Sequence, residues 1–158
     1  MGNIFSGSEV VEIGIQIEKN GRDYYNTLVS QSKNPKAQDI FKFLAAEEER
    51  HILAFQKVLV GVQKYEPQGL DSDEYYAYMN DLASEHVFTG KDKGKEIAQS
   101  VKSDLEGIEL AIKFEQDSIV FYEGMKKVVP AHDLKVVENL MNQEQNHLKQ
   151  LIELKHAI

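Results

Sequence analysis

Apolar residues recur three and four positions apart along four long stretches of the chain, and turn-forming residues fall between these stretches rather than within them. This spacing is that of one face of an α-helix, so each stretch predicts an amphipathic helix. A short turn at 33–35, with Asn34 as helix cap and Pro35 in the first helical position, makes the first two helices antiparallel neighbours. The predicted helices cover about 8–32, 34–64, 104–129 and 132–158.

A longer connection, about 65–103, separates the second long helix from the third. Within it, residues 71–73 are typical of a helix cap and predict a shorter helix through Phe88. Residues 90–94 predict a loop, and a second helical piece is expected around 95–102. Two long hairpins joined by such a crossover predict an all-α four-helix bundle that forms a single domain.

An internal repeat relates the two hairpins. A glutamate followed seven residues later by a tyrosine occurs twice, 97 positions apart, as Glu18 with Tyr25 and as Glu115 with Tyr122. The pattern Glu-x-x-His also occurs twice, 96 positions apart, as Glu48 with His51 and as Glu144 with His147. The nearly equal offsets predict that a pseudo-twofold axis relates the hairpins.

Polar residues interrupt the apolar stripe of every long helix near its middle. The first and third helices each carry one glutamate there, and the second and fourth each carry a glutamate and a histidine three residues later. The interrupting residues are Glu18, Glu48, His51, Glu115, Glu144 and His147. Four carboxylates and two imidazoles are therefore expected at one height inside an apolar core.

Burying these groups is costly. An ionised carboxylate without a partner destabilises the folded state by several kcal/mol even after the surrounding protein relaxes, and four carboxylates also repel one another. Two divalent cations would balance four negative charges, and neutral imidazoles would add ligands without adding charge. The pattern therefore predicts a site for two metal ions. The alternative for each Glu-x-x-His pair is an ion pair or a hydrogen-bonded core histidine.

Other acidic and imidazole residues are expected to lie at the surface. Glu153 and His156 repeat the Glu-x-x-His pattern, but each lies nine residues beyond its counterpart in the fourth helix, half a helical turn out of phase, and should face solvent. The same expectation applies to the residues that flank the second stripe and to those in or beside the connections: Glu47, Glu49, His86 and His132.

Composition and charge narrow the possible functions. The chain has 158 residues, a formal charge of −8 and no cysteine. The lack of cysteine excludes disulfides, a thiolate nucleophile, cysteine-ligated zinc and iron–sulfur clusters. An acidic chain without a basic stripe makes nucleic acid an unlikely partner. No apolar run is long enough to span a membrane, and the first residues lack the features of a signal peptide, so we expect a cytoplasmic protein.

These residues resemble the ferritin-like diiron-carboxylate proteins, especially the rubrerythrin and bacterioferritin branch. The resemblance covers the four main helices and implies a ferritin-like bundle that binds two Fe ions, with Mn or Zn as other possible occupants. It implies that Glu48 and Glu144 bridge the two metals. Glu18 with His51 would complete one metal site, and Glu115 with His147 the other. Tyr25 and Tyr122 match a tyrosine of this branch and are expected either to donate hydrogen bonds to the ligands or to pack as core aromatics.

The sequence also departs from this branch. Without cysteine there is no rubredoxin-type iron site, so an external electron donor is implied. The additional glutamate of rubrerythrins on the third helix is absent, since the neighbouring stripe positions are Ala111, Ile112 and Ser118. Haem is not expected, because Glu49 and Arg50 occupy the positions inside the first Glu-x-x-His where bacterioferritin has its haem-binding methionine.

The leading functional hypothesis is an oxidoreductase that reduces peroxide or dioxygen with Fe(II). One alternative is a module for iron or manganese handling or storage with little turnover. Another is a structural helical homodimer that associates through the crossover helix with Tyr75, Tyr76 and Tyr78. A homodimer is expected under either of the first two functions as well.

Overall fold

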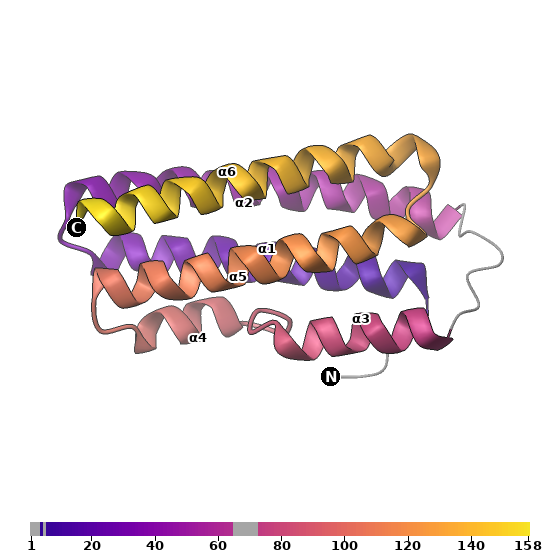
Figure 1. Cartoon of the computed structure of the whole chain (residues 1–158), viewed down its shortest axis with the longest axis horizontal. Coiled ribbons are helices and arrows are strands. Elements are labelled where there is room, and N and C mark those ends of the chain that lie inside the picture. The colour runs from indigo at the N-terminus through magenta and orange to yellow at the C-terminus, as the bar shows by residue number, and fades with distance from the viewer. Residues whose placement is uncertain (1–3, 5, 65–72) are drawn as a thin grey trace.

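Four long helices form the body of the molecule in the computed structural model, which describes residues 4, 6–64 and 73–158 (Figure 1). They are α1 (Gly7–Gln31), α2 (Pro35–Lys64), α5 (Asp104–Met125) and α6 (Leu134–Ala157). Two shorter helices, α3 (Asp73–Glu85) and α4 (Lys93–Ser100), follow one another in the crossover. The 3₁₀ turns η1 (Lys126–Val128) and η2 (Ala131–Asp133) join α5 to α6. All regular structure in the described ranges is helical, which confirms the predicted all-α bundle.

Side-chain caps begin three of the long helices. The Ser6 hydroxyl accepts a hydrogen bond from the backbone N–H of Glu9, so α1 begins slightly before the predicted start at residue 8. The Asn34 side chain accepts bonds from two backbone N–H groups at the start of α2, and the Ser103 hydroxyl caps α5. Each cap satisfies a donor that has no partner within its own helix.

The crossover runs along the outside of the bundle. In Figure 1, α3 and α4 lie along the side formed by α1 and α5, and α2 and α6 lie on the opposite side. Residues 65–72, including most of the predicted cap at 71–73, lie outside the described residues. The helix α3 ends at Glu85 rather than at Phe88, because the Phe88 ring leaves the helix to pack on Tyr24 and Phe114 in the core.

Asn20 of α1 anchors the α3–α4 connection. Its side-chain amide donates to the backbone carbonyls of Phe88 and Gly90, and its side-chain oxygen accepts from the N–H of Gly94. The first turn of α4 lies so close to α1 that a Cβ atom on Gly94 would overlap the Asn20 carbonyl. This buried asparagine therefore fixes where the crossover meets the bundle.

Two residues of the crossover are placed differently from the sequence prediction. His86 is buried rather than exposed, because its Nε2 pairs with the Ser118 hydroxyl of α5 at 2.8 Å. Tyr75 is also buried, and its hydroxyl donates to the carbonyl of Gly124 at 2.7 Å. Tyr75 thus packs into its own bundle, whereas Tyr78 is exposed. The homodimer stays a prediction.

The apolar core falls into two clusters. One contains Val10, Ile17, Phe55 and Met125, and the other contains Tyr24, Phe41, Ile108 and Leu151. Along each long helix the change from one cluster to the other occurs at the polar interruption of its stripe. The bundle thus holds a polar layer between two apolar ones.

No helix in the described part of the chain is both long and apolar enough to cross a membrane.

Candidate metal centre

The polar layer contains all six residues that the sequence predicts as metal ligands. Each is at most 2 % exposed: Glu18, Glu48, His51, Glu115, Glu144 and His147. They come from α1, α2, α5 and α6, because each occupies the middle of the stripe that its helix turns toward the others. The pseudo-twofold repeat places them in two matched halves.

The six residues form two overlapping groups. Ligand atoms of Glu18, Glu48, His51 and Glu144 lie within 4.8 Å of one another, and so do those of Glu48, Glu115, Glu144 and His147. Glu48 and Glu144 belong to both groups. One shared pair of glutamates, with two further ligands on each side, is the arrangement that the resemblance to the ferritin-like diiron-carboxylate proteins implies.

Both imidazoles turn Nδ1 toward the carboxylates. His51 Nδ1 lies 2.9 Å from Glu144 Oε1 and 3.4 Å from Glu18 Oε2. His147 Nδ1 lies 3.0 Å from Glu144 Oε2 and 3.6 Å from Glu115 Oε1. The two rings stack with their centroids 5.5 Å apart. Glu144 thus contacts both histidines, as a carboxylate shared by two sites should.

Tyrosines cross-link the two hairpins within the layer. The Tyr25 hydroxyl donates to Glu115 Oε1 at 2.7 Å, and the Tyr122 hydroxyl donates to Glu18 Oε1 at 2.6 Å. Each tyrosine therefore donates a hydrogen bond to the glutamate of the opposite hairpin. In the sequence, each tyrosine follows the glutamate of its own hairpin by seven residues. Both rings are also fully buried aromatics, so the two expected roles coexist.

Burial and crowding set the protonation of the layer. Burial, reinforced by the charges of neighbouring glutamates, raises the pKa of Glu48 and that of Glu144 well above the usual carboxyl value. Burial also opposes ionisation of Glu18, but the charge of His51 and hydrogen bonds from the surrounding side chains together outweigh it and lower the Glu18 pKa to about 2. The carboxylates in turn raise the pKa of both histidines, against the effect of their burial. Shared protons thus offset the negative charge of the layer when no cation is present.

The donor atoms fit divalent metal ions. Carboxylate oxygen and imidazole nitrogen are the ligands that Fe, Mn and Zn accept. Glu18 Oε2 is buried and accepts no hydrogen bond among the described residues, which leaves its lone pairs available to a cation. Each group supplies four ligands, and cations would take the place of the shared protons.

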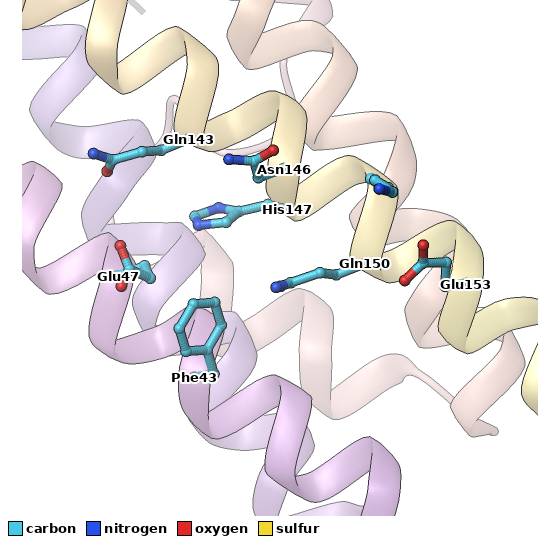
Figure 2. A pocket seen from close by; sticks show the side chains of 8 residues that line it. Phe43, Glu47, Gln143, Asn146, His147, Gln150 and Glu153 are labelled. Atoms are coloured by element: carbon cyan, nitrogen blue, oxygen red, sulfur yellow. The ribbon is translucent and has the colours of Figure 1, made fainter.

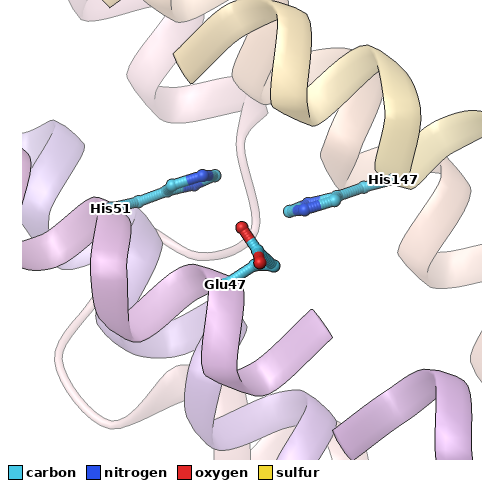
Figure 3. Close-up of side chains that lie close together, drawn as sticks. All are labelled: Glu47, His51 and His147. Atoms are coloured by element: carbon cyan, nitrogen blue, oxygen red, sulfur yellow. The ribbon is translucent and has the colours of Figure 1, made fainter. Parts of the chain in front are cut away.

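Glu47 lies beside this layer, although we expected it to face solvent. Its side chain is 14 % exposed, and it offers an oxygen within 4.8 Å of ligand atoms of His51 and His147 (Figure 3). A signal for it existed in the sequence, because Glu47 precedes His51 by four residues and so shares its helix face. The second Glu-x-x-His pair behaves as predicted, since Glu153 and His156 are both exposed.

Comparisons with known proteins agree with this architecture. None of the curated proteins compared with the chain matches it. A crystal structure described as a ferritin-like diiron-carboxylate protein of Thermotoga maritima superposes with a TM-score of 0.70 and 21 % sequence identity, covering 99 % of this chain and 98 % of that one. This likeness establishes the ferritin-like fold. The rubrerythrin family model matches residues 9–155, and the chain therefore belongs to the rubrerythrin family.

Proposed function

We propose that this protein is a diiron-carboxylate oxidoreductase that reduces peroxide or dioxygen with electrons from Fe(II). The observation that carries the proposal is the pair of overlapping four-ligand groups, buried in the bundle and sharing two carboxylates. Membership of the rubrerythrin family supports it, as does the diiron description of the Thermotoga maritima protein.

The chain's own residues divide into shared and terminal ligands. Glu48 and Glu144, which belong to both groups, would bridge the two ions. Glu18 and His51 would complete one site, and Glu115 and His147 the other. Two bound Fe(II) ions supply two electrons, which with two protons reduce one hydrogen peroxide to two water molecules. Mn or Zn could occupy the same donors.

The surroundings hold the ligands in place. Burial, together with the nearby carboxylates, raises the pKa of both Tyr25 and Tyr122 well above the ordinary phenol value. The two hydroxyls therefore keep their protons and donate hydrogen bonds to Glu115 and Glu18, which fixes the orientation of these carboxylates. The apolar clusters on both sides of the layer restrict water. Since no cysteine occurs in the 158 residues, electrons that restore Fe(II) must come from a donor outside them.

The test is to load the protein with Fe(II) without oxygen, add peroxide or oxygen, and follow the near-ultraviolet absorption of the oxidised iron. We expect two irons per chain and oxidation faster than in buffer. Glu144→Gln should lower both the iron content and the oxidation rate, because it removes a shared ligand. The control Glu85→Gln, at an exposed residue of α3, should match the unmodified chain. Unchanged spectra with both oxidants would reject the redox role. Two irons bound but oxidised no faster than in buffer would favour metal handling instead.

A further inference from the structure

The side of the bundle formed by α2 and α6 is hollowed beside the polar layer. Two hollows, of about 480 and 460 Å³, meet at Glu47 and Gln143, which line both of them. The first reaches His147 and the second reaches His51. The crossover helices α3 and α4 lie on the opposite side of the bundle, so they do not cover this groove (Figure 1).

Polar side chains form most of the groove's lining, together with two cationic residues, Arg50 and Lys149, and four apolar ones, Phe43, Ala54, Val136 and Leu140. Four residues of α6 line the first hollow: Gln143, Asn146, Gln150 and Glu153 (Figure 2). The second hollow adds Asn139 of α6. Amide and carboxylate oxygens suit a hydrated divalent cation.

Glu47 stands where the groove meets the polar layer. It lies between the two imidazoles, and together with them it offers three ligand atoms within 4.8 Å of one another (Figure 3). Its other neighbour is Arg50, whose guanidinium pairs with Glu47 Oε1 from an exposed position in the same helix. An incoming cation can displace this guanidinium at small cost, because the Arg50 side chain remains solvated.

We propose that the α2–α6 groove is the route by which divalent cations enter the metal centre, and that Glu47 is a transient ligand at its inner end. The proposal rests on the function proposed above. A neutral imidazole has one free lone pair, so His51 and His147 serve the outer position and the inner sites in turn rather than together. Glu47 would thus hold a cation with the histidines until it passes inward to the buried carboxylates.

The test measures the rate at which Co(II) loads the full chain without oxygen, followed by its visible absorption. Glu47→Gln keeps the shape of the side chain and removes its charge, and it should slow loading about tenfold, in the range of electrostatic effects on association rates. The final stoichiometry should stay at two ions per chain. Arg50→Gln removes the competing cation and should speed loading.

The control is Glu49→Gln, which makes the same change of charge one helix position beyond Glu48 on an exposed residue paired with Arg22. It should load at the unmodified rate. Loading of Glu47→Gln at that rate, or equal slowing in both variants, would overturn the entry role while leaving the metal centre intact. A stoichiometry below two in Glu47→Gln would make Glu47 a permanent ligand and would also overturn it. Failure of the unmodified chain to bind Co(II) would instead reject the metal centre itself.

Discussion

At the scale of single residues, the polar layer depends on hydrogen bonds between the hairpins. Tyr25 and Tyr122 each donate to a carboxylate that is fully surrounded by protein. A buried carboxylate that loses its donor keeps the cost of desolvation without the compensating bond. These two hydroxyls therefore stabilise the fold as well as orient the proposed ligands.

Tyr122→Phe should lower the free energy of unfolding of the metal-free chain by about 1–3 kcal/mol, because Glu18 loses a buried hydrogen bond. By the pseudo-twofold symmetry, Tyr25→Phe should have a similar effect through Glu115. Denaturant unfolding measures both. Tyr78→Phe serves as the control, since that ring is 50 % exposed, and an equal loss in the control would contradict the prediction.

His86 makes stability depend on pH. Burial lowers its pKa from 6.5 to about 4, against the opposing charges of Asp117, Glu115 and Glu18. Its Nδ1 accepts a hydrogen bond from the backbone N–H of Phe88, so Nε2 carries the ring proton and donates it in a hydrogen bond to the Ser118 hydroxyl. A second proton would have to displace the bond from Phe88. The neutral form is therefore the one compatible with the fold.

Because the folded pKa of His86 lies below the unfolded value, its contribution is complete above pH 6.5 and is lost as the pH falls toward 4. The loss amounts to about 3 kcal/mol. His86→Gln should flatten the fall in unfolding free energy over this range relative to the unmodified chain, while the exposed control His156→Gln should not. Other titrations cancel in the comparison, so parallel pH profiles for His86→Gln and the unmodified chain would refute the assignment.

At the scale of elements, one asparagine and one glycine seat the crossover on the bundle. Asn20 holds the α3–α4 connection through three hydrogen bonds, and Gly94 lets α4 reach the backbone of α1. Phe88 is placed in the core by the same contacts. The geometry of the crossover thus follows from α1 rather than from the sequence of the connection.

Gly94→Ala should destabilise the protein by about 2 kcal/mol or more, because the new methyl group meets backbone that cannot rotate away. Gly21→Ala is the matched control. A Cβ atom there would lie 3.6 Å from the nearest Glu48 carbon, an ordinary contact, and alanine favours the helix. Thermal unfolding of the two variants measures the difference, and equal stability would show that α4 can shift away from α1.

At the scale of the whole molecule, two apolar clusters enclose one polar layer, and a metal would act on the stability of the entire bundle. All four long helices supply proposed ligands, so an ion bound in the layer would link them. A ligand that binds only the folded state raises its stability through mass action. Metal binding and folding should therefore be coupled in this protein.

Addition of Fe(II) or Mn(II) to metal-free chain should raise its free energy of unfolding by about 2.7 kcal/mol for each site at a hundredfold excess over Kd. For a domain of this size that corresponds to a rise in Tm of roughly 5–10 °C per site. Scanning calorimetry without oxygen measures the shift. Substitution of both residues of the exposed Glu-x-x-His pair, Glu153→Gln with His156→Gln, should leave the Tm shift unchanged. A Tm that ignores both metals would favour a purely structural bundle.

The period of apolar residues was enough to predict the four long helices and the six residues of the polar layer. Both follow from local sequence, because a charged side chain in the middle of an apolar stripe must be buried when the stripe is buried. The internal repeat predicted that the two hairpins are related to one another. These features depend on spacing along one helix, which can be counted directly.

The tertiary structure alone decided the contacts between elements. Tyr25 and Tyr122 exchange partners across the hairpins, Asn20 reaches a connection about seventy residues away, and His86 turns inward to Ser118. Glu47 and Glu49 flank the same stripe position, yet only Glu47 faces α6. Helical periodicity places a residue on a face to within one position, and which neighbouring helix packs against that face determines whether the residue meets solvent, an imidazole or a backbone carbonyl.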